Sequence, residues 1–404
     1  MPQRYDVVVV GAGVIGLACA WRIAERNRSV AVLDPAPGSG ATWTAAGMLA
    51  PVTEFGYGEQ SLLRLNLVSA QRYPRFAADL IQATGRDIGY ARCGTLQVAW
   101  DSADLASLRD LHEQHRALGL RAELISGREL RRYEPALASG LPGALHAPDD
   151  HQVDNRALHQ TLLAAAAHAG AELLARSVGR VSVVDDRATG VTLIDADMKA
   201  DGETVAAQWV VVAAGAHTRR LGGLPASLTT PVRAVKGQTL RLRTAGPLLS
   251  HVVRGSVKGS PVYLVPRASG EIVVGASSED AGFDTRPRTG AIYELLRDAF
   301  ALVPGLAESS WEGVSTGLRP GTPDNAPMIG PTSIDGLIMA TGHYRNGMLL
   351  APVTADGVAS IVAGDGVPDE LRAFAPDRFA PDRFAPDRFD ADRAGAARAG
   401  EAAR

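Results

Sequence analysis

Near its N-terminus the chain reads Tyr5-Asp-Val-Val-Val-Val-Gly11-Ala-Gly13-Val-Ile-Gly16. Residues 5–10 are a β-branched run of the kind that forms a buried strand. A helical pattern then continues to about residue 26, and a second short apolar run, residues 29–33, follows it. The order predicts strand, tight turn, helix and strand, which is how a parallel α/β sheet begins.

The three glycines have the G-x-G-x-x-G spacing that binds a dinucleotide when it joins a strand to a helix. Gly11 permits the tight turn, Gly13 lets the backbone approach a pyrophosphate, and Gly16 lets the helix pack closely on the strand. The helix N-terminus offers free N–H groups to the anion, and an acidic residue ending the next strand can accept hydrogen bonds from a ribose. The residues predicted to bind cofactor here are Gly11, Gly13, Val14, Ile15, Gly16 and Asp34. NAD and FAD share this fingerprint, so the turn alone does not distinguish them.

Composition limits the class of protein. With 404 residues the chain can form about two domains, and a net charge of −3 suggests no nucleic-acid partner. The two cysteines, Cys19 and Cys93, form no metal or disulfide pattern, so no metal site is expected. The apolar stretch 7–21 contains spaced glycines and is short for a membrane span, so we expect a cytoplasmic protein without a membrane anchor.

The rest of the chain interleaves two patterns. Strand and helix patterns of the α/β type occur at the start, in the middle and near the end, and alternating strands of the antiparallel type lie between them. Residues 317–328 contain three prolines and are expected to be irregular. We therefore expect one α/β domain with an α+β insert. The expected division is residues 1–85, 149–224 and 319–366 for the nucleotide-binding domain, 86–148 and 225–318 for the substrate domain, and 367–404 for a tail.

The tail contains a repeat. The sequence Phe374-Ala-Pro-Asp-Arg378 recurs at residues 379–383 and 384–388 and then degenerates. A proline every five residues prevents a regular helix, and the composition is typical of disorder. We expect a disordered tail, and the alternative is a short docking segment that uses the spaced phenylalanines.

Five further segments carry a resemblance to a known family. They are Gly40-Ala-Thr42-Trp43-Thr44-Ala-Ala46-Gly47-Met48-Leu-Ala-Pro51, Val210-Val-Val-Ala-Ala214-Gly215, Tyr263-Leu-Val-Pro-Arg267, Gly317-Leu-Arg319-Pro-Gly-Thr-Pro-Asp-Asn325 and Thr341-Gly342-His-Tyr344-Arg345-Asn346-Gly347-Met348-Leu-Leu-Ala-Pro352. In this order, and together with the glycine turn, they resemble the D-amino-acid oxidase superfamily, and within it the glycine oxidase (ThiO) branch. The resemblance spans the chain to about residue 365.

The resemblance implies a Rossmann-like FAD-binding domain with an interleaved antiparallel-sheet substrate domain, and noncovalently bound FAD. For the substrate it implies Arg319 as the carboxylate-binding arginine, Tyr263 as a second carboxylate contact, Arg345 as a further arginine on that side, and Met48 as a residue lining the flavin. A guanidinium suits a carboxylate because it can donate two parallel hydrogen bonds. The cofactor contacts it implies beyond the glycine turn are Thr42, Trp43, Thr44, Ala46, Gly47, Met48, Val181, Ala214, Gly215, Gly342, Tyr344, Arg345, Asn346, Gly347 and Met348.

The implied reaction oxidises glycine, and less well sarcosine or small D-amino acids, to the imine while oxygen becomes hydrogen peroxide. In the family the imine of glycine supplies thiamin thiazole synthesis, so hand-over to a thiazole synthase is an expected partnership, and a homo-oligomer, often a homotetramer, is the expected assembly. No side chain need act as a general base, because positioning the substrate Cα over the flavin does most of the work.

Other readings stay open at this point. A sarcosine oxidase, or a D-amino-acid oxidase or dehydrogenase with another electron acceptor, would carry much the same motifs. An NAD(P)H-dependent reductase would need a second dinucleotide fingerprint, and the sequence has one. A flavin-binding subunit without chemistry, recruited through the tail, is a third class.

Overall fold

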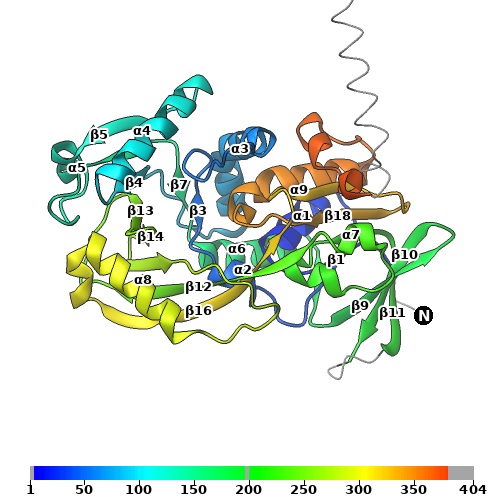
Figure 1. The fold of residues 1–404 in the computed structure, drawn as a ribbon. Helices are drawn as coiled ribbons and strands as arrows, with labels where there is room; N and C mark the ends of the chain where they lie inside the picture. Colours follow the sequence, from blue (N-terminus) through cyan, green and yellow to red (C-terminus); the bar gives the residue numbers. More distant parts are fainter. Residues whose placement is uncertain (1–3, 196–199, 381–404) are drawn as a thin grey trace, which may run out of the picture.

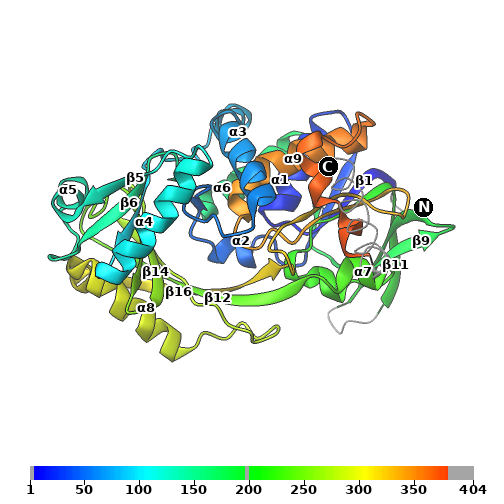
Figure 2. The ribbon, with the colours of Figure 1, turned by 45° about the horizontal axis from the view of Figure 1, so that its top comes forward.

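The computed structural model describes residues 4–195 and 200–380, which form two eight-stranded sheets that lie side by side (Figure 1). The first sheet and its helices occupy one half of the molecule, and the second sheet with its own helices occupies the other. Turning the molecule shows β12 and β16 running from the second half toward the first (Figure 2).

The first sheet has a parallel core with β1 at its centre. In spatial order its strands are β17 (Met328–Pro331), β18 (Leu337–Thr341), β11 (Ala200–Val212), β1 (Arg4–Val10), β2 (Val30–Leu33) and β8 (Glu172–Leu174), with β10 (Arg187–Ile194) and β9 (Ser177–Val184) attached beside β11. The neighbouring pairs from β18 to β8 are parallel. Strand β17 pairs with β18 antiparallel, and β10 pairs with β11 antiparallel.

Both faces of β1 are buried, which explains its continuous valine run. Val7 and Val9 face a helical layer, and Val8 and Val10 face the layer that contains β9 and β10. The helices that share the first core are α1 (Val14–Ala24), α3 (Gln60–Thr84), α6 (Asn155–His168) and α9 (Gly347–Ala363). Side chains of successive residues point to opposite faces of a strand, so two of the four valines are buried in each of the two cores that flank the sheet.

The second sheet is antiparallel except for the pair β13–β4. In spatial order its strands are β16 (Ser310–Gly321), β12 (Arg233–Arg243), β15 (Glu271–Gly275), β14 (Ser260–Pro266), β13 (Val252–Val257), β4 (Thr95–Ala99), β6 (Gly143–Ala147) and β5 (Glu123–Ser126). Helix α8 (Thr289–Leu302) packs on one face, where Leu264 and Leu302 are fully buried. The opposite face is left to meet the first half.

Shorter elements complete the described chain. They are α2 (Ala41–Thr44), β3 (Met48–Leu49), α4 (Ser102–Ala117), α5 (Gly127–Tyr133), β7 (His151–Gln152), α7 (Ala226–Thr229) and the 3₁₀ helices η1 (Gly215–Arg220), η2 (Pro304–Glu308), η3 (Asp369–Phe374) and η4 (Pro376–Phe379). In the sequence, Asp154 before a helical pattern predicts an N-cap. Helix α6 does begin there, because the Asp154 carboxylate accepts hydrogen bonds from the N–H groups of Arg156 and Ala157.

The α/β fold with an inserted antiparallel sheet is confirmed. The second sheet takes its strands from residues 95–147 and 233–321, so β16 crosses the boundary expected near residue 318. The domain boundaries themselves stay a prediction.

Two expectations differ from the structure. The proline-rich stretch after residue 317 is regular as far as Gly321, because β16 is an edge strand and Pro320 there loses no essential ladder bond. The tail is structured as far as residue 380, where Leu371 and Phe374 are buried against the first core. The expectation of disorder from residue 367 is therefore wrong for residues 367–380, and residues 381–404 lie outside the described part.

Within the described residues, no helix is both long and apolar enough to cross a bilayer. The same residues contain no group of three or more histidine, cysteine or acidic side chains arranged to hold a metal ion.

Candidate functional site

The residues predicted to bind cofactor gather at one edge of the first sheet. Gly342 follows β18, Ala214 and Gly215 follow β11, Gly11 follows β1, and Asp34 follows β2. These four strands are neighbours and parallel, so their carboxyl ends meet at the same edge. That edge is where α/β sheets of this type bind nucleotides.

The glycine turn is packed so tightly that side chains are excluded from it. Gly11 has φ +108°, and a Cβ there would lie 2.5 Å from the carbonyl oxygen of Ala213. A Cβ on Gly16 would lie 1.9 Å from the carbonyl oxygen of Gly11. The turn, the end of β11 and the first turn of α1 therefore form a backbone cradle, which suits the close approach of a pyrophosphate.

The start of α1 meets the loop that follows β2. The N–H of Val14 donates to the Thr42 hydroxyl at 3.0 Å, and a Cβ on Gly13 would lie 3.2 Å from the same oxygen. The Asp34 carboxylate accepts from the N–H groups of Ala12 and Ala36, each at 2.8 Å. Asp34 thus braces the glycine turn in addition to its predicted role toward a ribose.

His159 on α6 contacts the backbone of the glycine turn. Its Nε2 lies 3.0 Å from the Ala12 carbonyl oxygen, and its ring fills the space that a Cβ on Gly38 would take. Burial lowers the pKa of His159, so a neutral ring with the proton on Nε2 donates this bond. No sequence pattern pointed to this histidine.

The segment from residue 41 to residue 48, hereafter the 41–48 loop, is held by its carbonyl groups. Asn155 Nδ2 donates to the carbonyl oxygens of Thr42 (2.8 Å) and Trp43 (3.1 Å). Thr239 Oγ1 donates to that of Thr44 at 2.8 Å. These donors come from α6 and β12, so both halves of the molecule hold this loop.

Two buried arginines complete this support. Arg267 Nη2 donates to the Ala46 carbonyl oxygen at 2.6 Å, and Arg267 and Arg241 both donate to Asn155 Oδ1, at 3.4 and 3.1 Å. Burial lowers the pKa of Arg267 to about 10, so it remains charged at neutral pH. Arg267 stands in a motif that carries the family resemblance, but its role could not be predicted from sequence because its partners come from distant segments.

Arg319 and Tyr263 meet on the face of the second sheet that looks toward this loop. The Arg319 guanidinium lies over Gly237, where a Cβ would be only 2.0 Å from Nη1, and the Tyr263 ring lies over Gly275 in the same way. The Arg319 guanidinium donates to the Ser277 carbonyl oxygen at 3.1 Å. Burial raises the pKa of Tyr263, and the nearby positive charge of Arg319 opposes the rise. The pair presents a planar cation beside a phenol that stays protonated at neutral pH.

Met48 lies in the same small cluster as Tyr263. The cluster contains Ala46 from the 41–48 loop and Val265 from β14, while Leu264 points to the opposite face against α8. Residues 263–265 therefore alternate between the two faces of the sheet. Three of the four residues assigned to the substrate side therefore stand together, next to the loop assigned to the flavin.

The N-terminus of α9 completes the edge. Asn346 is its N-cap residue, and the Tyr344 N–H donates to the Pro320 carbonyl oxygen at 3.0 Å. This bond joins the last cofactor segment to the strand that carries Arg319. His343 is buried, its pKa is lowered by burial to about 3, and its Nε2 lies 3.0 Å from the hydroxyl of Thr354 on α9. It is a neutral support for the helix.

Comparison with known proteins gives the chain its family. The family model described as FAD dependent oxidoreductase (DAO) matches residues 6–361. The chain belongs to this family of FAD-dependent oxidoreductases.

Individual relatives agree with it. Glycine oxidase of Geobacillus kaustophilus is 35% identical over 381 residues, which covers 94% of this chain and 98% of the relative. Its crystal structure covers 93% of this chain and 99% of its own, with a TM-score of 0.85. The bifunctional protein ThiO/ThiG of Synechocystis is 34% identical, and the match covers 94% of this chain but 54% of that protein. The chain is therefore an FAD-dependent oxidoreductase of the amino-acid oxidase class to which these relatives belong.

The cofactor is FAD, and the site geometry fits it. The glycine cradle excludes side chains where a pyrophosphate would lie, and a Cβ on Gly215 would meet nothing within 4 Å, which leaves space after β11. We propose that the cradle holds the pyrophosphate and the 41–48 loop together with the α9 N-terminus holds the flavin. The positive end of the helix dipole favours negative charge at that point.

Three further predicted residues, Trp43, Val181 and Arg345, make contacts that do not bear on their predicted roles. Trp43 is 37% exposed and stacks with Arg156, whose guanidinium carbon is 4.0 Å from the ring centroid. Val181 is buried in β9, and its N–H donates to the Gly222 carbonyl oxygen at 3.0 Å. Arg345 is exposed and lies 4.6 Å from the ring centroid of Tyr344. Their roles stay predictions.

Replacing Asn155 by alanine is expected to weaken FAD binding by about ten- to a hundredfold. The change leaves two loop carbonyls and two buried guanidinium groups without this partner, and each unsatisfied buried polar group costs about 1–3 kcal/mol. Asn155→Asp keeps the acceptor for the arginines but removes the amide donor, so it separates the two contributions. The measurement is the FAD dissociation constant, followed by flavin fluorescence. An unchanged constant in Asn155→Ala would show that the loop does not need this support.

The segment just after β3 is held by a buried carboxylate. Asp150 is fully buried and accepts hydrogen bonds from the N–H groups of Val52 (2.9 Å) and Thr53 (2.7 Å) and from the Thr53 hydroxyl (2.6 Å). Arg254, which lies opposite Tyr263 on β13, donates to the Thr53 carbonyl oxygen at 3.0 Å. Asp150 and Arg254 therefore fix the chain that runs past the Tyr263 side of the site.

Burial raises the pKa of Asp150 from 3.8 to about 6. Because the folded state binds this proton more tightly than the unfolded state, the contribution of Asp150 to stability falls as the pH rises from 3.8 to about 6, by up to about 3 kcal/mol. We expect the unfolding free energy of the wild type, minus that of Asp150→Asn, to fall over this range. Denaturant titrations at several pH values measure it, and a constant difference would contradict the raised pKa.

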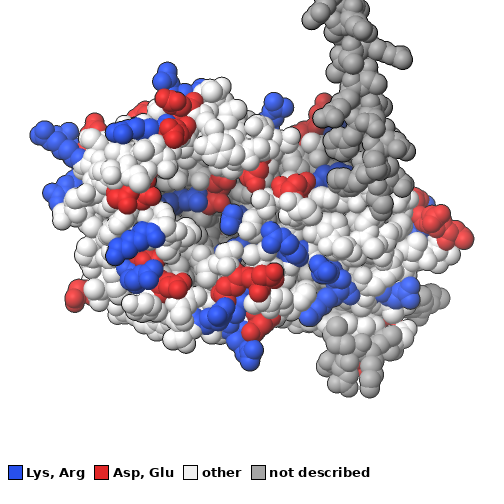
Figure 3. Space-filling model, viewed as in Figure 1, with Lys and Arg blue, Asp and Glu red and all other residues white. Residues whose placement is uncertain are grey.

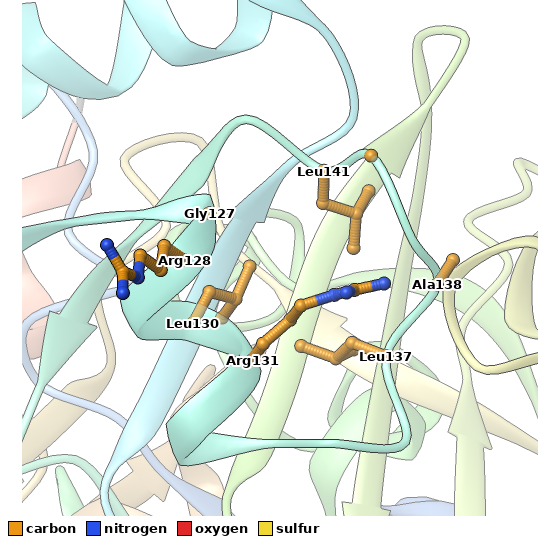
Figure 4. Close-up of a pocket in the computed structure, with 8 residues that line it drawn as sticks. Gly127, Arg128, Leu130, Arg131, Leu137, Ala138 and Leu141 are labelled. Carbon is orange, nitrogen blue, oxygen red and sulfur yellow. The ribbon is translucent and has the colours of Figure 1, made fainter.

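The surface is hollowed between the two halves, and basic and acidic side chains line the hollow (Figure 3). A separate pocket of about 360 Å³ lies between α5 and the chain that leads into β6, where Arg131 extends between Leu137 and Leu141 (Figure 4). None of the residues predicted for the site lines this pocket. Its position near the end of the second half, away from the sheet edge, separates it from the cofactor chemistry.

Proposed function

We propose that this chain oxidises glycine, with oxygen as the electron acceptor. The observation that carries the proposal is the meeting of Arg319 and Tyr263 beside Met48, next to the 41–48 loop. A guanidinium with a phenol hydroxyl beside it suits the carboxylate of a small amino acid. The 35% identity with the glycine oxidase of Geobacillus kaustophilus supports the choice of glycine.

The residues of the chain act by placing the substrate. In the proposal, Arg319 and the Tyr263 hydroxyl bind the carboxylate, which fixes the position of Cα relative to the 41–48 loop. Bound FAD supplies the chemistry, because it accepts the two electrons and passes them to oxygen. Met48 and the wall of its cluster exclude water and limit the size of the substituent on Cα.

The overall reaction converts glycine, oxygen and water into glyoxylate, ammonia and hydrogen peroxide, with the imine released first. We infer that the imine supplies thiazole synthesis. The bifunctional ThiO/ThiG protein of Synechocystis supports this inference, because this chain matches 54% of its length and the rest of that protein lies outside the match. We also propose that the protein forms a homo-oligomer in the cytoplasm.

An anaerobic titration of the purified holoprotein tests the function. Glycine is added in small portions while the visible absorbance of the flavin is followed. Bleaching by glycine, reversed by air with one peroxide formed per glycine, is the expected result. Bleaching by sarcosine or a D-amino acid but not by glycine would move the substrate to the alternatives, and bleaching by NADH alone would overturn the proposal.

A further inference from the structure

The first tail repeat is docked on the body of the protein. Phe374 is 3% exposed and belongs to the core that α1, α3 and α9 share. Pro376 is buried, and its Cδ lies 3.6 Å from the position that a Cβ on Gly330 would take. The phenylalanine and proline of the repeat thus lie against the first half of the molecule.

Arg378 anchors the same repeat. Its Nε and Nη2 donate to the two carboxylate oxygens of Asp324 at 2.8 and 3.2 Å, and Nη2 also donates to the Ala326 carbonyl oxygen at 2.8 Å. The arginine side chain is 13% exposed. Although burial acts to raise the pKa of Asp324, its bonds with Arg378 hold that pKa below its ordinary value. This is a specific two-point ion pair rather than a loose surface contact.

The repeat forms a self-contained unit. Arg378 Nη1 donates to the carbonyl oxygens of Phe374 and Ala375 at 3.1 and 3.2 Å, so the arginine closes the turn of its own repeat. On its other side the guanidinium carbon lies 4.2 Å from the ring centroid of Phe379. These contacts within the repeat all lie in the six residues Phe-Ala-Pro-Asp-Arg-Phe.

The same six residues begin at positions 374, 379 and 384. We propose that Asp324, Ala326 and Gly330 form a seat for this hexapeptide, hereafter the repeat seat, and that the three copies are interchangeable occupants of it, so that the tail docks in three registers. Each copy brings its own phenylalanine, proline and arginine, and each is followed by the phenylalanine on which the guanidinium stacks.

The tail of the same chain is the occupant, because a tethered copy is present at a high effective concentration. Leu371, which is 1% exposed, anchors the chain three residues before the first copy and favours that register. Docking the second copy lengthens the connection by five residues, and the entropy of closing a loop grows slowly with its length. The shift is therefore a small perturbation.

The repeat seat is part of the segment that leads away from Arg319. Asp324 also accepts from the N–H of Ala326 at 3.1 Å, and the Thr322 hydroxyl donates to the Ala326 carbonyl oxygen at 2.7 Å. Arg378 binds this turn at both ends. If the first copy is altered, a second or third copy can bind this turn in its place. This proposal does not depend on which substrate the enzyme oxidises.

Trypsin mapping of the full-length holoprotein reports the register directly. Trypsin cuts after exposed arginines, and a docked Arg-Phe bond should be cut about tenfold more slowly than a free one. In the wild type we expect protection after Arg378 with cutting after Arg383 and Arg388. In Phe374→Ala, which keeps every cleavage site, protection moves to Arg383. In Phe374→Ala with Phe379→Ala, it moves to Arg388.

Two controls make the outcome decisive. Phe389→Ala changes the phenylalanine that ends the third hexapeptide and begins the degenerate fourth copy. The first copy is untouched, so protection after Arg378 should be the same as in the wild type. Asp324→Ala breaks the repeat seat, and all three sites should then be cut. A new protected site cannot arise from partial unfolding. If Phe374→Ala exposes all three sites as Asp324→Ala does, or if protection appears only as dimers form with rising protein concentration, the proposal is overturned.

Discussion

Replacing Arg319 by alanine is expected to lower kcat/KM for glycine, the proposed substrate, by about a thousandfold, which corresponds to about 4 kcal/mol. The guanidinium is half-buried, lies directly on the backbone at Gly237, and acts electrostatically on Tyr263. Arg254 also acts electrostatically on Tyr263, but it is held by the Thr53 carbonyl oxygen, so without Arg319 a substrate carboxylate would enter the site without its bidentate partner. Steady-state kinetics with the FAD content measured in parallel checks this result.

Two variants sharpen the test of Arg319. Arg319→Lys keeps the charge but loses the planar fork, so it should recover only part of the lost activity. Arg233→Ala removes an exposed arginine of the same strand pair, which lies opposite Gly321, and should change kcat/KM less than twofold. If Arg319→Ala stays within about tenfold of the wild type, the carboxylate binds elsewhere.

Replacing Gly16 by alanine abolishes FAD binding at ordinary concentrations. The new Cβ would lie 1.9 Å from the Gly11 carbonyl oxygen, and rotating a side chain cannot relieve a contact between Cβ and backbone. The glycine turn must therefore move away from α1, at a cost of about 4 kcal/mol or more, which is about a thousandfold in affinity if the chain still folds.

The measurement for Gly16 is FAD retained after desalting, with circular dichroism to show that the variant is folded. Gly290→Ala is the matched control, because a Cβ there meets nothing within 4 Å and the site lies in α8. It should retain FAD fully. Normal FAD content in Gly16→Ala would contradict the tight cradle.

The sequence was most informative where local chemistry decides the structure. The glycine spacing, the valine run before it and Asp34 at the end of the next strand predict one edge of the sheet, and the cap at Asp154 predicts the start of α6. Each of these depends on residues close together in the chain.

The support of the 41–48 loop could not be predicted in this way. Asn155, Thr239 and Arg267 come from α6, β12 and the end of β14, and their shared purpose appears only when three segments meet. The docked repeat was missed for a related reason. A proline every five residues suggests disorder, but Arg378 finds Asp324, a partner distant in sequence that no local pattern could indicate.

The central place of β1 has a consequence for the order of assembly during synthesis. Strand β1 pairs with β2, which follows it closely in sequence, but its other neighbour, β11, ends at Val212, and β18 beyond that ends at Thr341. One flank of β1 therefore stays open until Val212 has emerged, about half-way along the chain. Long-range parallel pairing is slow and leaves aggregation-prone edges. Loading of the flavin is consequently a late event, and a shortage of it during rapid expression should yield aggregates rather than a soluble apoprotein.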